Sequence, residues 1–505
     1  MFGGGTRVPD PMSIHQLRSF VIAAGLITTA CTAEPSTQGG LPEGSAEDSS
    51  STSATFRQDP VVNPRLASGF LEASLEEQIA DFLDAPNSAK GAVIAEEMGA
   101  TGEVRWVPWL LDLHRLAQSN LVDAAAIDSL ASLTGIASVN QRTADFQNYG
   151  TWSQTEGIDG GDGYRDWKLG LYGLIDDEFA ELLAEVPDDT TLSQIHWGGV
   201  TRGGIPELND PERVPVRDAD WMVPDELVLG AEVDGAAVAY PVRILGHHEL
   251  ANDVIAGIPV SMVYCTLCRT GLLFDRRIDI DGAEVVLDFQ TSGLLWSSNK
   301  VMVDEPTDTL WQHLSGIGIA GPLEGRELEQ FPVVTTTWAD WVAEHPDSET
   351  LVIPRPIFFP ETPERPPIAY GYEPGGAYQS YYANPDVWFP ILDTPDVFAL
   401  KTEILGIRHE GESLAVSVEA LADAGPQVFV VGGRPVLLAP TGSGARGYDG
   451  SGLDLGAGPA PDITDVDPDQ LTLSDGSVLP RLPVEQSFWF AWFGNHQDTR
   501  TWPTP

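Results

Sequence analysis

The residues with the clearest capacity for chemistry are two cysteines, Cys265 and Cys268, in the segment VYCTLCRTG. Two thiols separated by two residues at a predicted strand end can cycle between dithiol and disulfide, form an inert structural disulfide, or supply half of a zinc site. The thiolate is the reactive form, and a nearby cation lowers the thiol pKa. Arg269, Arg276 and Arg277 follow closely in the sequence. We therefore predict a redox-active pair in which Cys265 attacks, Cys268 resolves and Arg269 stabilises the thiolate.

A second polar segment, GHHELANDV, precedes the cysteine strand and contains His247 and His248. An imidazole such as that of His248 can move the proton during thiol–disulfide exchange, and that interpretation requires no cofactor. Imidazole and thiolate can instead bind copper or zinc together, and Met302 can add a thioether ligand for Cu(I). The alternative is thus a copper or zinc protein that uses His247, His248, Cys265, Cys268 and Met302. A further alternative is a cell-surface binding module with a structural disulfide, in which the histidines bond to neighbouring backbone.

The third cysteine, Cys31, directly follows the short apolar run VIAAGLITTA. This run is too short to span a bilayer as a mature helix and is typical of a signal-peptide core. The order of residues 27–31 resembles a bacterial lipobox, in which Cys31 is lipidated. We predict a signal peptide over residues 1–31 and a flexible tether, rich in Ser, Thr, Gly, Pro and acids, over residues 32–66. The expected location is extracytoplasmic, where disulfides persist, with the lipid anchor as the only membrane attachment.

The composition is that of a globular protein with a large negative charge. Hydrophobic residues make up 42% of the 505-residue chain, and 75 acidic against 27 basic residues give a formal charge of −48. Binding to nucleic acid depends on Lys and Arg neutralising phosphates, so a nucleic-acid partner is excluded. Docking onto an anionic membrane surface is disfavoured for the same reason. The expected partner is a protein or small molecule that carries a thiol or disulfide.

The pattern along the chain predicts an α+β protein with a helical N-terminal region and a duplicated, mainly β core. Residues 67–190 have helical periodicity, interrupted by a Gly-rich break at 157–167 and followed by one more helix near 174–185. The β pattern begins near Leu192. The strands that must position the cysteines are predicted as a hairpin over 226–245, a strand over 258–265 and a hairpin over 271–290 that turns near Asp281-Gly282, with a helix over 335–346.

Three sequence matches predict the duplication. Segment 228–245 aligns without gaps on 404–421, and with the same offset 257–260 falls on 433–436. Segment 336–347 aligns on 487–498, which pairs Trp338 with Trp489, Trp341 with Trp492 and His345 with His496. Three matches in the same order indicate a degenerate repeat. We assign the first repeat to 191–350, a Pro- and Tyr-rich connector to 351–396 and the second repeat to 397–505. The cysteine pair lies in the first repeat alone, so the chemistry is expected there.

The chain from about residue 190 to residue 500 resembles a known bacterial family, domain of unknown function 3179. The matching segments are IHWGGVTRGGIPEL, AYPVRILGHHELANDVIAGIPVSMVYCTLCRTGLLFDRR, TSGLLWSSNKVMVD, TDTLWQHLSGIGIAGPLEG and TTWADWVAEHPD, and FWFAWFGNHQDT fits longer members. The resemblance implies secretion or lipid anchoring but carries no established activity. Some members are described as selenoproteins with selenocysteine at the cysteine-pair motif, which implies redox use. Thr266 stands where the family usually has proline, and the loss of proline's stiffness implies a shifted redox poise.

Overall fold

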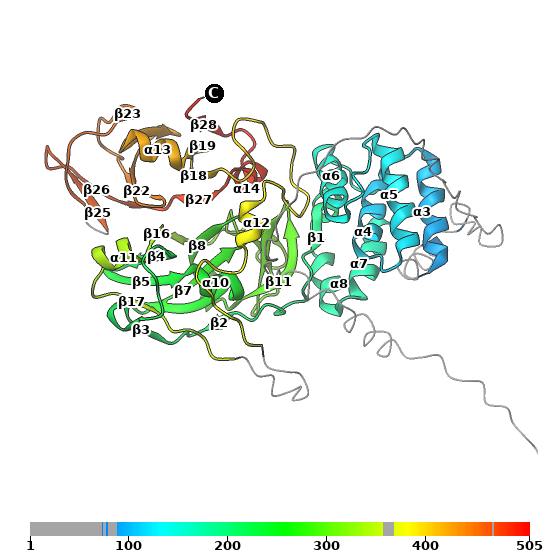
Figure 1. Ribbon diagram of the computed structural model, residues 1–505, viewed down its shortest axis with the longest axis horizontal. Coiled ribbons are helices and arrows are strands. Elements are labelled where there is room, and N and C mark those ends of the chain that lie inside the picture. The colour runs from blue at the N-terminus through cyan, green and yellow to red at the C-terminus, as the bar shows by residue number, and fades with distance from the viewer. Residues whose placement is uncertain (1–72, 74–76, 79–87, 357–367, 467–468, 505) are drawn as a thin grey trace, which may run out of the picture.

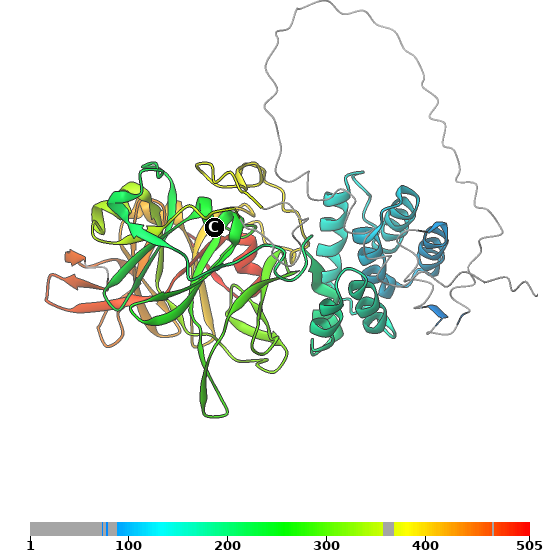
Figure 2. The ribbon, with the colours of Figure 1, turned by 90° about the horizontal axis from the view of Figure 1, so that it is seen from below.

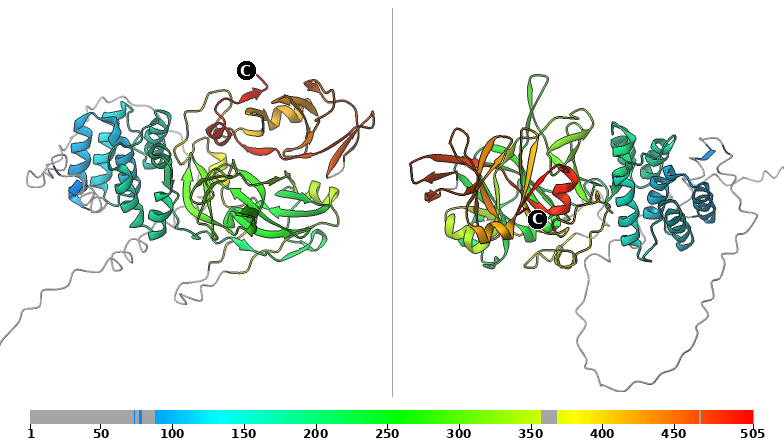
Figure 3. Two further views of the ribbon diagram at one scale, coloured as in Figure 1. Left: turned by 180° about the vertical axis from the view of Figure 1, so that it is seen from behind. Right: turned by 90° about the horizontal axis from the view of Figure 1, so that it is seen from above.

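The computed structural model describes residues 73, 77–78, 88–356, 368–466 and 469–504. The predicted signal peptide with Cys31 and the tether lie outside the described residues, as do residues 67–87 of the predicted helical region except 73, 77 and 78. A helical region lies beside a β-rich core (Figure 1), and the two remain distinct blocks from other directions (Figure 2, Figure 3). The predicted α+β organisation is confirmed. In the part of the chain that the structure describes, no helix is both long and apolar enough to cross a membrane.

The helical region contains more helices than the sequence pattern predicted. They are α3 (Ala89–Thr101), α4 (Val107–Leu116), α5 (Asn120–Thr134), α6 (Arg142–Thr155), α7 (Tyr164–Gly173), α8 (Asp177–Ala184) and α9 (Asp189–Gln194), with a 3-10 turn at Val104–Trp106. The predicted helix near 174–185 is α8, which Asp176 caps by accepting a hydrogen bond from the Glu178 amide. Helix α7 begins inside the predicted Gly-rich break, directly after Gly163. Glycines there end one helix and start the next.

A buried polar network joins this region to the core. Asp112 of α4 accepts hydrogen bonds from Tyr164 (2.8 Å) and Tyr172 (3.1 Å) of α7. Lys168, also on α7, donates to the main-chain oxygen of Ile195 over 2.7 Å. Ile195 begins strand β1 (Ile195–Trp197), which pairs antiparallel with β11 (Phe289–Trp296) of the core. The helical region is therefore attached to the core through a shared sheet edge.

The first repeat forms three sheets and a hairpin. The sheet orders are β16-β4-β5-β17-β3, β15-β8-β7-β6-β2 and β1-β11-β12-β13-β14, and β9 pairs with β10. Bounds are β2 (Leu208–Asn209), β3 (Arg213–Pro215), β4 (Leu227–Val233), β5 (Ala236–Pro241), α10 (Val242–His248), β6 (Leu250–Ile255), β7 (Ile258–Cys265), β8 (Thr270–Asp275), β9 (Arg277–Ile280), β10 (Ala283–Val286), β12 (Asn299–Asp304), β13 (Leu310–Gln312), β14 (Ile317–Ala320), β15 (Gln330–Phe331), β16 (Val333–Thr337), α11 (Trp338–Glu344) and β17 (Glu349–Leu351), with a 3-10 turn at Val216–Asp218.

The predicted strands around the cysteines are confirmed. The hairpin predicted over 226–245 is β4 and β5, although its last residues form α10 instead of continuing as strand. The strand predicted over 258–265 is β7, with the same bounds. The turn at Asp281-Gly282 joins β9 to β10.

The connector and second repeat follow. Helix α12 (Gln379–Ala383) is the regular element of the described connector, residues 351–356 and 368–396. The second repeat contains β18 (Glu403–His409), β19 (Glu412–Ser417), α13 (Val418–Ala424), β20 (Gln427–Val431), β21 (Arg434–Pro440), β22 (Ala445–Asp449), β23 (Gly458–Pro459), β24 (Ile463–Val466), β25 (Gln470–Leu473), β26 (Val478–Leu482), β27 (Glu485–Phe488), α14 (Trp489–Asn495) and β28 (Arg500–Trp502). In Figure 1 this repeat, orange to red, lies against the green first repeat.

The two repeats share a sheet topology. In the first, β4 pairs antiparallel with β16 and β5, and β17 lies parallel to β5. In the second, β18 pairs antiparallel with β27 and β19, and β28 lies parallel to β19. Trp338 and Trp489 each begin the helix that follows β16 or β27. The ring centroids of Trp341 and His345, and those of Trp492 and His496, are 4.1 Å apart in both repeats. The equivalences predicted from the sequence therefore hold in the structure.

Candidate functional site

The cysteine pair lies in the turn that joins β7 to β8. Cys265 is the last residue of β7 and is paired with Thr270, the first residue of β8. The chain reverses through the intervening residues, and Arg269 closes the turn at a positive φ of 54°. This geometry places the two sulfur atoms 2.9 Å apart, with both cysteines as free thiols. Since a disulfide bond is about 2.05 Å long, a small movement would bring the sulfurs to bonding distance.

The turn is held by hydrogen bonds from both repeats. The carbonyl of Cys268 accepts hydrogen bonds from Thr270 Oγ1 (3.1 Å) and from the main-chain amide of Phe488 on β27 (2.9 Å). The site is therefore completed by the second repeat, although both cysteines come from the first.

The two thiols have opposite electrostatic environments. Burial raises the pKa of Cys265, but the neighbouring Cys268 thiol and the His313 imidazole, with its charge, outweigh it and lower the pKa well below its usual value. Burial, the hydrogen bond to Cys265 and the Cys265 charge raise the pKa of Cys268 well above its usual value, and Glu249 adds to this. One thiol is thus set up to ionise while its neighbour keeps its proton.

His313 follows β13 and is fully buried. Its Nε2 lies 3.2 Å from the main-chain oxygen of Val263, so Nδ1, which has no other partner among the described groups, is the nitrogen available to Cys265.

The β11–β12 turn forms the other wall of the site. Its central residues, Ser297 and Ser298, both have positive φ, at 50° and 58°, as in a type I′ hairpin turn, a conformation that is uncommon for residues other than glycine, asparagine and aspartate. Cys268 Sγ lies 3.5 Å from the carbonyl oxygen of Ser298. The main-chain amide of Lys300 contributes hydrogen bonds that lower the pKa of both cysteines.

A buried ion pair braces this wall against the cysteine turn. The Lys300 ammonium forms an ion pair with Glu249 and donates to Thr291 Oγ1 over 3.0 Å. Glu249 accepts a hydrogen bond from Thr266 Oγ1, 3.1 Å away, inside the turn. Thr266, which stands where the resemblance leads one to expect proline, therefore fastens the turn through its hydroxyl.

The connector covers the pair. Cys265 is 2% exposed and Cys268 is 0% exposed, and both pack in one apolar cluster with Tyr381 of α12. In Figure 1, α12 lies between the first repeat and α14. The Tyr382 hydroxyl donates to the main-chain oxygen of Thr266 over 3.0 Å. Lys401 donates to three carbonyls of this segment, at 2.6, 2.8 and 2.7 Å, and its ammonium lies 3.3 Å from the centre of the Tyr381 ring.

Of the residues predicted to act on the pair, Arg269 and His248 are engaged elsewhere. Arg269 forms an ion pair with Glu403 over 3.2 Å, and its guanidinium lies 5.1 Å from the centre of the Tyr382 ring. Both ring nitrogens of His248 have partners, the carbonyl of Pro206 at 2.8 Å and the hydroxyl of Tyr372 at 2.6 Å. Neither side chain is directed at a cysteine sulfur.

His247 and Met302, predicted as further metal ligands, lie in other environments. The His247 ring stacks on Tyr370 with centroids 4.6 Å apart, and burial lowers its pKa to about 4. Met302 is fully buried in the apolar cluster that contains Trp311, not in the cluster of the cysteines. Within the described ranges, no group of three or more His, Cys, Asp or Glu side chains is arranged to hold a metal ion.

Sequence reasoning overlooked His313 and Lys300. His313 is far from the cysteines along the chain, and only the folding of β13 beside β12 brings it to the site. A signal for Lys300 did exist, because the chain contains only four lysines and this one is followed by the apolar run Val301–Val303. A charged residue that is rare in the chain and occupies a strand pattern is a candidate for a buried partner.

The second repeat has no equivalent of the pair. The paired residues Ala439 and Arg446 on β21 and β22 correspond to Val263 and Leu272 on β7 and β8, but the turn between them is shorter. By strand register, Thr441 takes the position of Cys265. The second repeat therefore lacks both the cysteines and the longer turn that holds them in the first repeat.

Replacing His313 with glutamine should raise the pH at which the Cys265 thiolate forms, by about one pH unit or more. The imidazole and its charge lower this pKa, and burial, which raises it, would remain. The thiolate's ultraviolet absorbance as a function of pH measures the shift without requiring a reagent to enter the site. His248→Gln is the matched control. A shift in His248→Gln and none in His313→Gln would show that the partner of Cys265 is misassigned.

Comparison with known proteins places the chain in a family and supplies no activity. The family model described as "Protein of unknown function (DUF3179)" matches residues 202–499. No curated protein and no solved structure matches. The match begins after the helical region and includes the cysteine turn, the connector and nearly all of the second repeat. Because it extends over more than half of the 505 residues, this protein is a member of the DUF3179 family.

Proposed function

We propose that this protein is an extracytoplasmic, lipid-anchored thiol–disulfide oxidoreductase whose reactive groups are Cys265 and Cys268. The observation that supports this most strongly is the asymmetry of the pair: the sulfurs are 2.9 Å apart, yet the pKa of Cys265 is lowered and that of Cys268 is raised. A pair that served only as a structural disulfide would gain nothing from a buried histidine beside one sulfur. An attacking thiol needs such a partner, because the thiolate is the nucleophile.

The proposed reaction is a two-electron exchange. The Cys265 thiolate attacks one sulfur of a substrate disulfide, which forms a mixed disulfide and releases the other substrate sulfur as a thiolate. Cys268 then attacks the Cys265 sulfur, and the second substrate sulfur leaves with the proton that Cys268 gives up. The substrate is reduced to two thiols while the pair is oxidised to a disulfide. With a dithiol substrate the same steps run in reverse.

Access to the pair requires movement of the connector. Both cysteines are buried in a cluster that includes Tyr381 of α12, and Lys401 holds α12 and the residues directly after it through three carbonyls. Local opening of a short segment costs less free energy than global unfolding, so such a cover can open while the sheets stay folded. We propose that opening of α12 admits the thiol or disulfide partner.

The experiment is a redox titration of the purified chain in glutathione buffers. We expect the Cys265–Cys268 disulfide to form and break reversibly, at a potential above about −300 mV, the range of labile catalytic disulfides rather than structural ones. Thiol alkylation followed by mass spectrometry counts the free thiols at each potential. A disulfide that stays closed far below this range would indicate the structural alternative.

Copper or zinc that co-purifies with the pair, and is lost in both Cys265→Ser and Cys268→Ser, would support the metal-binding alternative.

The anchor is tested separately. We propose that Cys31 is lipidated, since it follows the apolar run and precedes the polar tether. The full chain should be found in the membrane fraction of a bacterial host and a Cys31→Ser variant in the soluble fraction, as judged by immunoblotting. If the variant stayed with the membrane as the parent does, the lipobox assignment would be abandoned.

A further inference from the structure

A polar cavity of about 700 Å³ lies in the second repeat, apart from the cysteine pair. It is lined by β18, the β18–β19 turn, β27 and the residues that follow α14, and Glu327 of the first repeat closes one side. In Figure 1, β18, β27 and α14 are labelled in the orange-to-red part of the molecule. Cavities that hold small ligands commonly have volumes of roughly 300–1,000 Å³, so this one is large enough for an organic ligand.

Two polar atoms in the cavity wall are buried without a hydrogen-bond partner among the described residues. The Glu485 side chain is 5% exposed, and its Oε2 makes no hydrogen bond with any described group. The same holds for the buried Nε2 of His496. A buried polar atom left without a partner costs roughly 1–3 kcal/mol, so a ligand that supplies the missing hydrogen bonds recovers that free energy.

The guanidinium in the wall is already engaged. Arg408 lies 3.2 Å from Glu485 Oε1 and 3.0 Å from Glu327 Oε1, and it donates to the carbonyl of Ser315 over 3.1 Å. Glu410, Glu412 and Asp498 add further carboxylates around the opening. The unpartnered Glu485 Oε2 and the carboxylates around the opening are acceptors in a negative field, which favours a cationic donor.

We propose that this cavity binds an organic cation that carries a primary ammonium group, with Glu485 Oε2 accepting one ammonium hydrogen and His496 Nε2 accepting another. A primary ammonium has three donors and no acceptor, which matches the two orphaned acceptors and the carboxylates at the rim. A bare metal ion is a poorer match, because none of the described acidic and histidine side chains converge in groups of three or more.

The protonation behaviour of the wall supports the same ligand. Burial raises the pKa of Glu485 to about 7, against the opposing effect of Arg408, and Glu327 adds to the rise. Burial and the charge of Arg408 lower the pKa of His496 to about 4, so near neutral pH its ring is uncharged and can accept a hydrogen bond. An ammonium bound to Glu485 favours the ionised carboxylate. Binding should therefore tighten from pH 6 to pH 8 and release a proton from Glu485 at the lower pH.

Isothermal titration with spermidine tests this proposal, with the uncharged 1,8-octanediol as the control ligand. We expect saturable one-to-one binding of spermidine at pH 8 and none of octanediol. Glu485→Gln should weaken binding by about tenfold or more, since a charge-assisted hydrogen bond is lost, and should abolish its pH dependence. Glu410→Gln, at the exposed β18–β19 turn, should weaken binding about two- to fivefold.

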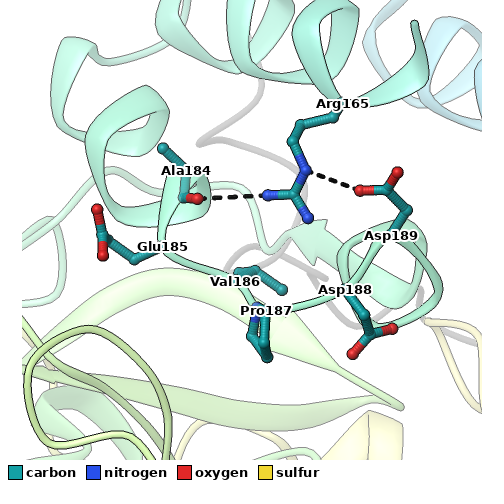
Figure 4. A pocket seen from close by; sticks show the side chains of 7 residues that line it. All are labelled: Arg165, Ala184, Glu185, Val186, Pro187, Asp188 and Asp189. Carbon is teal, nitrogen blue, oxygen red and sulfur yellow. Dashed lines mark hydrogen bonds and ion pairs between the residues drawn. The ribbon is translucent and has the colours of Figure 1, made fainter. Parts of the chain in front are cut away.

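A second acidic hollow supplies the matched control. It lies in the helical region and is lined by Arg165, Glu185 and Asp188, among others (Figure 4). There the Arg165 guanidinium donates hydrogen bonds to Asp189 over 2.7 Å and to the carbonyl of Ala184 over 3.3 Å. Glu185→Gln should leave spermidine affinity unchanged. If Glu185→Gln and Glu485→Gln weakened binding equally, spermidine would bind non-specifically through the overall negative charge of the protein. That result, or undiminished binding in both Glu485→Gln and Glu410→Gln, would overturn the proposal.

Discussion

Alanine at Gly230 or Gly406 is expected to destabilise the protein by about 3 kcal/mol or more, one of the largest effects of any single substitution in the core. A Cβ atom at Gly230 would lie 2.1 Å from Cζ3 of Trp341, and one at Gly406 would lie 2.1 Å from Cζ3 of Trp492. Real Cβ atoms do not approach other atoms so closely. Either the strand or the indole must therefore move.

The indoles cannot move without further loss. Both tryptophans are fully buried, and each is held through its indole nitrogen, Trp341 by Ser348 Oγ at 3.0 Å and Trp492 by Thr499 Oγ1 at 2.9 Å. A histidine ring packs against each indole, with ring centroids 4.1 Å apart. The two substitutions therefore test the same packing of glycine, tryptophan and histidine in each repeat.

Urea denaturation followed by tryptophan fluorescence measures the effect, and Gly456→Ala is the matched control. A Cβ atom at Gly456 would meet no heavy atom of a described residue within 4 Å beyond its chain neighbours, and the backbone there has no positive φ. Alanine at this position should therefore be nearly neutral. Denaturation midpoints of Gly230→Ala and Gly406→Ala equal to that of Gly456→Ala would contradict the packing described for both repeats.

The repeated strands and helices could be predicted from the sequence because the pattern of each is local. The hairpin at Asp234-Gly235, the strand that ends at Cys265 and the equivalence of Trp341 with Trp492 depend on residue types at short spacing. Where one face of a strand is buried, the alternation of apolar and polar residues strongly specifies its register in the sheet.

The partners of the cysteines could not be predicted in the same way. His248 is close to Cys265 in sequence, yet α10 ends there and turns its ring toward Tyr372 of the connector. His313 is distant in sequence and reaches the site through the order of strands in its sheet. Sequence proximity favoured His248 because nothing local in the sequence encodes which strands become neighbours. The contact of Tyr381 with the cysteines could not be predicted for the same reason, because it depends on where the connector crosses the core.

Cys268→Ser is expected to accumulate a stable mixed disulfide at Cys265, whereas Cys265→Ser is not. In Cys268→Ser the His313 contact that lowers the Cys265 pKa remains, and the serine hydroxyl can still donate to the thiolate. The nucleophile is thus retained while the resolving thiol is lost. In Cys265→Ser, burial and Glu249 still raise the pKa of Cys268. A thiol whose pKa is raised in this way stays largely protonated at pH 7, so it attacks slowly.

The parent protein should pass through the same adduct without accumulating it. Once the Cys265 sulfur is bound to a substrate sulfur, it no longer holds the charge that keeps Cys268 protonated, and the neighbouring thiol can attack across a very short loop. Its product is the internal disulfide.

The most direct measurement of the central claim is intact-mass spectrometry of the three proteins after incubation with oxidised glutathione at pH 7, quenched by acid. The predicted result is a glutathione adduct on Cys268→Ser at a yield at least about tenfold above that on Cys265→Ser, and an internal disulfide without adduct in the parent. Equal adduct yields on the two variants would contradict the assignment of Cys265 as the attacking thiol. The absence of adduct from both variants, with a parent that never closes its disulfide, would contradict thiol–disulfide exchange at this site.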